Sequence, residues 1–152
     1  MKRTSVHDGF TLVEMMVVLA ILLVLAAICY PSYTAYVVKA RRAQARVALM
    51  ETMQQQERHF TRTNTYVAFS STSDHPDARY FRWWSGARPA TSAYELRGEE
   101  CDDQPIERCI VLKAIPGTAR VDPLFRDPDC ETLVLHSSGA REAGGASTGC
   151  WP

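Results

Sequence analysis

The chain of 152 residues has little of what catalysis requires. It contains only four histidines, and none stands at a spacing from Cys, Asp or Glu that is typical of a metal site or a catalytic triad. These are His7, His59, His75 and His136. A glycine-rich phosphate-binding loop is also missing from the sequence. We therefore expect no enzymatic activity, no cofactor and no bound metal.

Net charge is absent as well, since 17 Lys and Arg balance 17 Asp and Glu. No strong field of the whole molecule therefore favours nucleic acid or anionic lipid. A content of 46% hydrophobic and 22% charged residues fits a globular fold. The length suits one domain with an appendage.

Charged side chains are missing from Met15 to Val38. Residues 10–30 span about 30 Å as a helix, which is enough to cross a bilayer. Glu14 stands at the entrance to this run, and a carboxylate at membrane depth is costly enough that it normally has a function. Lys2 and Arg3 precede the run and predict a cytoplasmic N-terminus by the positive-inside bias. Residues 31–152 would then lie outside the cytoplasm.

Glycine and proline are absent between Ser32 and Pro76. We predict one helix of about 50 residues, from about Phe10 to about Phe60, because good helix formers dominate its second half. Pro31 is expected to kink this helix rather than end it. The second half is amphipathic, and its predicted apolar stripe comprises Val47, Met50, Met53 and Phe60.

Beyond residue 62 the chain changes to short runs rich in aromatic or β-branched residues, bounded by Gly and Pro. We predict about four strands in an antiparallel meander, at residues 80–84, 93–97, 109–115 and 132–136. Residues 139–149 are glycine-rich and predict a loop. The fold class is α+β, with a long N-terminal helix packed on a small antiparallel sheet.

Four of the five cysteines lie in the polar region behind the apolar segment. They are Cys101, Cys109, Cys130 and Cys150, whereas Cys29 lies within the apolar run. This arrangement indicates an oxidising compartment and two disulfides rather than free buried thiols. Three connectivities are possible and the sequence does not choose among them, although pairing of neighbours is the simplest.

The N-terminal sequence resembles that of a type IV prepilin. The resemblance is carried by a short basic leader ending in Gly9, then Phe10, then Glu14 at the fifth position after Gly9, with the apolar run behind them. Pro31 falls where pilins commonly have their helix kink. The resemblance extends over roughly residues 1–60. It divides the chain into a leader at 1–9, a transmembrane and filament-core helix at 10–30, and a periplasmic globular domain at 31–152.

This resemblance implies how the chain is processed. A prepilin peptidase would cut between Gly9 and Phe10 and methylate the new amine of Phe10. An amine at a helix N-terminus is unfavourable because it faces the positive end of the helix dipole, and a carboxylate relieves it. Glu14, four residues on, would compensate its own amine or that of a neighbour and guide the subunit into a filament. The implied partners are other pilins, major and minor, the peptidase and the inner-membrane assembly platform.

The C-terminal sequence resembles the PilE-like minor pilins. It has a cysteine, a strand, a Ser-Gly turn and a final Cys-Trp, from Cys130 through Gly139 to Cys150 and Trp151. Residues 41–66 resemble the same group. The implied function is a structural minor pilin that supports pilus assembly, twitching motility, adhesion or DNA uptake. A pseudopilin of type II secretion is the alternative from another class, and such proteins usually lack this disulfide loop.

A DNA-binding competence pilin is the other alternative. The segment from Arg79 to Trp84, with Arg88 nearby, interleaves arginines and aromatics that can pair with phosphates and stack on bases. The same alternation also suits a strand packed on a helix. The terminal loop argues against DNA, because Arg141 is its only basic residue and Glu131 and Glu142 oppose it.

Two clusters of acidic residues remain, at residues 99–103 and 122–131. Neither has the glycine and the spacing of a calcium-binding EF-hand. We therefore predict solvated acidic loops.

Overall fold

The computed structural model describes residues 10–151, and the predicted leader, with Gly9, lies outside them. The described chain begins with one long helix, α1 (Leu12–Thr63), as the sequence predicts. The helix continues through Pro31. The chain separates into two compact units, Met1–Val37 and Val38–Pro152.

The start of α1 is fixed by Thr11. Its hydroxyl accepts a hydrogen bond from the backbone N–H of Glu14 at 3.2 Å, which satisfies one of the unpaired amides of the first turn. The pattern Thr-x-x-Glu at Thr11 and Glu14 is that of a capping box. The cap places Glu14 in the first turn of the helix.

The first unit is apolar around its whole circumference. The side chains from Phe10 to Ile28 are exposed, with Phe10 at 80% and Leu23 at 70%. An 18-residue window of α1 has a mean hydropathy of 2.9 and none of it is buried within the chain. By length and composition, α1 can therefore cross a membrane.

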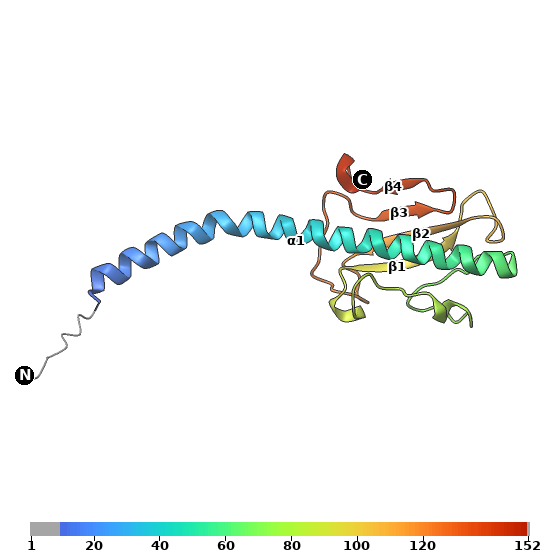
Figure 1. Ribbon diagram of the computed structural model, residues 1–152, viewed down its shortest axis with the longest axis horizontal. Helices are drawn as coiled ribbons and strands as arrows, with labels where there is room; N and C mark the ends of the chain where they lie inside the picture. Colours follow the sequence, from blue (N-terminus) through green and yellow to red (C-terminus); the bar gives the residue numbers. More distant parts are fainter. Residues whose placement is uncertain (1–9, 152) are drawn as a thin grey trace, which may run out of the picture. The chain divides into compact units, whose positions relative to one another are not determined.

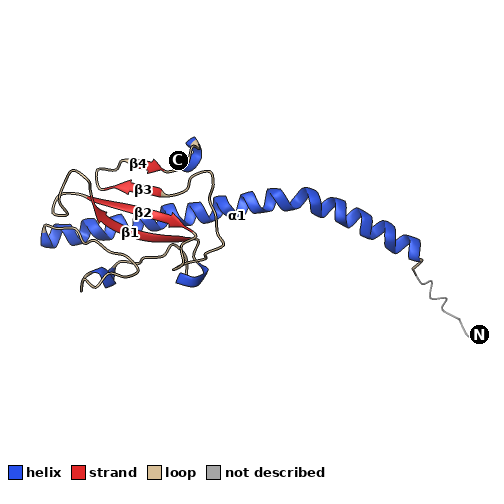
Figure 2. Cartoon of the chain, turned by 180° about the vertical axis from the view of Figure 1, so that it is seen from behind, coloured by secondary structure: helices blue, strands red, loops and turns tan. Residues whose placement is uncertain are grey.

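The second unit packs the C-terminal half of α1 on one face of a four-stranded sheet (Figures 1 and 2). The strands are β1 (Tyr94–Glu100), β2 (Ile110–Pro116), β3 (Leu133–His136) and β4 (Arg141–Ala143). All neighbours are antiparallel and the order is β1-β2-β3-β4, which confirms the predicted meander. Ala45, Ala48 and Leu49 of α1 share one hydrophobic core with the inward residues of the sheet.

The end of α1 is also specified locally. Asn64 adopts a φ of 54°, and its N–H bonds to the carbonyl of Phe60 at 2.8 Å, as expected for a left-handed cap residue. The hydroxyls of Thr61 and Thr63 donate to the carbonyls of Arg58 and His59. The Asn64 bond satisfies the carbonyl of Phe60, one of the four that the last turn would leave unpaired.

One predicted strand is wrong. Residues 78–80 form a short 3-10 helix, η1 (Ala78–Tyr80), and only Trp84 makes a bridge to the sheet, opposite Glu95. Phe81 turns inward and stacks on Phe69 at 5.5 Å between ring centroids, and the bridge at Trp84 consists of two backbone hydrogen bonds, from Leu96 to Trp83 and from Ser85 to Tyr94. The fourth strand is instead β4, within residues that the sequence predicts as loop.

The predicted helix stripe is also partly wrong. Val47 is 50% exposed, whereas Met50, Met53 and Phe60 pack against the edge of the core. The buried stripe contains three polar residues, Arg42, Thr52 and Gln56, of which Arg42 and Gln56 form side-chain hydrogen bonds. Gln56 exchanges two hydrogen bonds with the backbone of Val67, at 2.8 and 3.0 Å, as a neighbouring strand would.

Candidate functional site

The residues predicted for assembly lie at the start of α1. Phe10 directly precedes the capped first turn, and Glu14 is exposed within that turn. Between Glu14 and Lys39 the helix carries no charged side chain. Glu14 is therefore the single carboxylate on a long apolar surface, four residues from Phe10.

Both disulfides join neighbouring cysteines. Cys101 pairs with Cys109 and closes the turn between β1 and β2, while Cys130 pairs with Cys150 and closes the terminal loop around β3 and β4. Cys29 is free and exposed on the apolar helix. The Cys130–Cys150 loop is further held by Trp151, whose indole N–H donates to the carbonyl of Glu142 at 2.7 Å.

A buried ion pair ties the segment just before this loop to α1. The guanidinium of Arg42 contacts both carboxylate oxygens of Asp127, and Tyr94 donates its hydroxyl to the same carboxylate. Burial opposes ionisation of Asp127, but the hydrogen bonds from Arg42 and Tyr94 outweigh it and hold its pKa below the usual range. The prediction of a solvated acidic loop is therefore wrong for Asp127, which is 3% exposed.

A second buried carboxylate lies on β1. Glu95 is fully buried and accepts hydrogen bonds from Ser71 at 2.9 Å, Thr118 at 2.6 Å and Arg97 at 3.1 Å. Burial alone would raise the pKa of Glu95, but these three donors lower it. Glu95 thus fixes the loops around residues 71 and 118 on the sheet.

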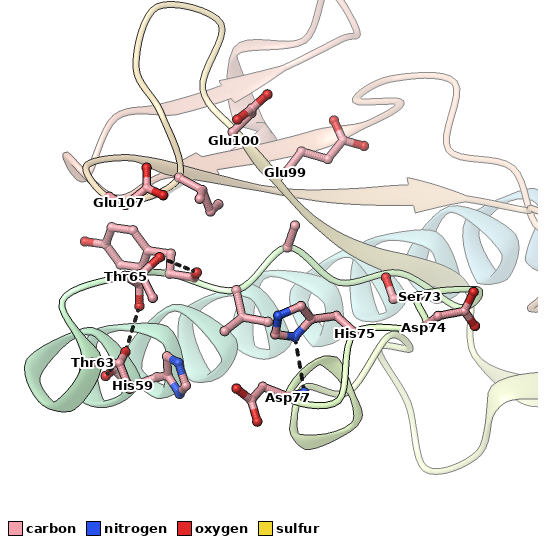
Figure 3. Close-up of a pocket in the computed structure, with 14 residues that line it drawn as sticks. His59, Thr63, Thr65, Ser73, Asp74, His75, Asp77, Glu99, Glu100 and Glu107 are labelled. Atoms are coloured by element: carbon pink, nitrogen blue, oxygen red, sulfur yellow. Dashed lines mark hydrogen bonds between the residues drawn. The ribbon is translucent and has the colours of Figure 1, made fainter.

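An acidic hollow of about 830 Å³ lies between the end of α1 and the β1–β2 turn (Figure 3). Tyr66, Val67 and Ile106 are among the apolar residues that line it. Its carboxylates are Asp74, Asp77, Glu99, Glu100 and Glu107, and no Lys or Arg lines it. Glu99 is paired with Lys113 at 2.6 Å. Within residues 10–151 no group of three or more His, Cys, Asp or Glu could hold a metal ion.

Basic side chains gather on the other side of His59, which lines both this hollow and the next. Arg58, Arg62 and Tyr80 line a hollow of about 420 Å³. Arg79 and Arg82 line an adjoining hollow of about 400 Å³ that shares Tyr80 and Phe81 with the first. We call these two hollows the arginine groove. Arg88 is exposed but lines neither of them.

Comparison with known families decides what kind of protein this is. Residues 31–134 match a family model described as type IV minor pilin ComP, DNA uptake sequence receptor. The chain belongs to this family of type IV minor pilins. Residues 5–30 of the minor pilin match a second model, described as the prokaryotic N-terminal methylation motif.

Relatives of the minor pilin are pilins too. It is 28% identical over 100 residues to the type IV major pilin protein PilA of Myxococcus xanthus (strain DK1622), covering 66% of this chain and 44% of that protein. The chain thus spans less than half the length of that relative. A solved type IV pilin from Shewanella oneidensis is 26% identical, with a TM-score of 0.47, 76% of this chain covered and 98% of the other.

The sequence thus identified the family and the fold, a long helix on an antiparallel sheet. It missed the pairing of Arg42 with Asp127. The two residues are 85 positions apart, and no local pattern marks them as partners. It also missed Arg58 and Arg62 as neighbours of the arginine-aromatic segment. Their spacing of four residues on a helix places them on one face, but only the tertiary fold brings Arg79 and Arg82 beside them.

Proposed function

We propose that this minor pilin is cut between Gly9 and Phe10 by a prepilin peptidase and methylated on the amine of Phe10. Residues 10–30 then hold it in the inner membrane by a single span, with the domain of residues 31–152 in the periplasm. The match of residues 5–30 to the N-terminal methylation motif supports this processing. The two disulfides of the second unit suit an oxidising compartment.

Glu14 carries the assembly step of this proposal. In lipid the carboxylate is expensive, and an opposite charge nearby reduces the cost. The new amine of Phe10 supplies that charge, either within the subunit or from a neighbouring pilin already in the fibre. Thr11 supports the role because its cap keeps Glu14 in the first turn. The apolar helix moves from lipid into a bundle of like helices, and the assembly platform promotes this transfer.

In the fibre the subunit supports pilus assembly, and through it twitching motility and adhesion. The observation that carries this function is the family match over residues 31–134, joined to an exposed apolar first half of α1 whose one carboxylate is Glu14. We also propose that the helix kinks at Pro31. This kink would set the direction in which the globular domain projects from the fibre.

Two measurements test the proposal. Mass spectrometry of the protein from membranes should give a mature N-terminus at Phe10, heavier by one methyl group. Deletion of the gene should reduce pili and twitching and leave protein secretion intact. An unprocessed N-terminus would refute the processing, and a secretion defect with normal pili would instead identify a pseudopilin of type II secretion.

A second candidate function is DNA binding during DNA uptake. The description of the matched family as a DNA uptake sequence receptor favours it. So does the arginine groove, which supplies positive charge that the terminal loop lacks. A strain that keeps its pili but loses DNA uptake on deletion of the gene would support this function. Normal DNA uptake in that strain would contradict it.

A further inference from the structure

The arginine groove concentrates positive charge on a protein whose net charge is zero. Four arginines line it, and no carboxylate is among the described residues that do so. They are Arg58, Arg62, Arg79 and Arg82. The two halves of the groove share Tyr80 and Phe81, so the arginines surround an aromatic centre. This composition suits a ligand with several negative charges and flat or apolar parts.

The charges in the groove are mostly unpaired. Arg58 and Arg62 are exposed, stand four residues apart on α1 and have no ion-pair partner among residues 10–151. Like charges at this spacing repel each other. Arg82 reaches Glu51 only at 3.7 Å, and both side chains are exposed, so this pair is weak. A bound anion would therefore relieve repulsion without first having to break a strong pair.

The aromatic centre is available for contact. Tyr80 is 65% exposed, and Arg79 lies over its ring at 5.1 Å from the centroid. The neighbouring Phe81 is buried, stacked on Phe69 and edge-on to His59. Tyr80 is therefore accessible to a sugar or base, which a stacking platform requires.

The surroundings limit where a polyanion can lie. Beyond His59 the acidic hollow repels phosphate, since five carboxylates line it and only Glu99 has an ion-pair partner in the described chain. The terminal loop between Cys130 and Cys150 has a single arginine, Arg141, and no lysine, and Glu131 and Glu142 are exposed nearby in the sequence. The arginine groove is therefore the better phosphate site of the two.

The geometry points to the arginine groove as the DNA-binding site of this minor pilin, with phosphates on its four arginines and Tyr80 against a sugar or base. This inference rests on the proposed DNA-binding function and adds the residues that perform it. The acidic hollow forms the boundary of the footprint, so the duplex lies on one side of His59.

The test is a titration of the full-length protein in detergent micelles with a labelled DNA duplex at several salt concentrations. For each phosphate contact, the slope of log K against log salt concentration is about −0.9. Two double variants remove the arginines in pairs: Arg58→Gln/Arg62→Gln and Arg79→Gln/Arg82→Gln. Each should weaken binding at least tenfold and make the slope less steep by the amount that nearly two phosphate contacts contribute. Tyr80→Ala should weaken binding roughly tenfold with no change of slope, because stacking releases no counterions.

A matched control removes the same charge elsewhere. Arg108 and Arg120 are exposed and form no ion pair within residues 10–151, so Arg108→Gln/Arg120→Gln should leave affinity and slope unchanged. Conversely, Asp77→Asn and Glu107→Gln in the acidic hollow should tighten binding. Near-UV circular dichroism of each variant verifies that the globular domain is folded.

The possible results distinguish an error in the proposed binding site from an error in the proposed DNA-binding function. If the wild-type protein binds DNA and both double variants bind equally well, the arginine groove is the wrong site and DNA binding itself stands. Loss of binding by Arg141→Gln alone would assign the terminal loop instead. If the wild-type protein shows no salt-dependent binding, both the DNA-binding function and this site are refuted.

Discussion

Arg42 of α1 and Asp127, 85 residues later, form a buried ion pair with two contacts, Nε to Oδ2 at 2.8 Å and Nη2 to Oδ1 at 2.6 Å. The same carboxylate also accepts from the N–H of Cys130 at 3.3 Å. The pair therefore joins the helix that enters the globular domain to the start of the terminal disulfide loop. Asp129 adds a weaker contact to Arg42 at 3.2 Å.

Removing one partner of the buried pair of Arg42 and Asp127 should lower the free energy of unfolding much more than breaking an exposed ion pair does. Arg42→Met leaves the buried Asp127 without its cation, and we expect the free energy of unfolding to fall by about 3–5 kcal/mol. Urea unfolding of the detergent-solubilised protein, followed by near-UV circular dichroism, measures this change. The control Glu51→Gln breaks the exposed pair with Arg82 and should cost less than about 1 kcal/mol. Equal effects of the two variants would contradict the structural role of Arg42.

The same pair should make stability depend on pH in the acid range. Hydrogen bonds from Arg42 and Tyr94 hold the pKa of Asp127 below its usual range despite burial. The folded state therefore binds the proton less readily than the unfolded state, whose aspartate has a pKa of about 3.9. The stabilisation is complete above that value and is lost as the pH falls through it toward the lower folded pKa. Unfolding midpoints measured from neutral pH downward should fall more steeply for the wild-type protein than for Asp127→Asn.

The terminal disulfide between Cys130 and Cys150 should stabilise the fold by about the amount that its loop length predicts. For the sequence separation of 20 between Cys130 and Cys150, the chain-entropy model predicts about 3 kcal/mol. Cys130→Ser/Cys150→Ser should lower the free energy of unfolding by this amount. Peptide mapping without reductant establishes the pairing first. Recovery of a peptide that joins Cys109 to Cys130 would contradict the connectivity.

Gly145 should tolerate no side chain. A Cβ there would lie 2.1 Å from the backbone oxygen of Asp129, so the terminal loop would have to shift. Gly145→Ala should cost about 1–3 kcal/mol, as overpacking typically does. Gly149→Ala in the same loop is the matched control, since its nearest neighbour is 3.8 Å away. If Gly145→Ala is as stable as Gly149→Ala, the loop around Gly145 is less tightly packed than the structure shows.

The sequence correctly predicted the elements that depend on local composition and on the spacing of apolar residues. Absence of charge from Met15 to Val38 and absence of Gly and Pro beyond Ser32 led to α1, and β-branched runs led to three of the four strands. It failed where tertiary partners override local preference. Phe81 has strand propensity but packs on Phe69, and Arg42 has the charge of a surface residue but is satisfied by Asp127.

The candidate functional residues also differ in whether a local sequence pattern reveals them. Glu14 could be proposed from the sequence because its signal is local: it is a carboxylate alone in an apolar run. The arginine groove could be predicted only in half, since the segment from Arg79 to Trp84 was visible but its helical neighbours were not. Such a groove exists only after α1 and the following loop have packed together.

The most direct test of the account is incorporation of Glu14→Ala into pili. Immunoblots of membranes and of sheared pili compare processing with assembly, with Cys29→Ala, an exposed position on the apolar helix, as a control that keeps the carboxylate and its cap. We predict that Glu14→Ala is cut at Gly9 and stays in the membrane in normal amount, but is largely absent from sheared pili. Glu14→Ala present in sheared pili at the wild-type level would contradict the role of Glu14 as the assembly residue.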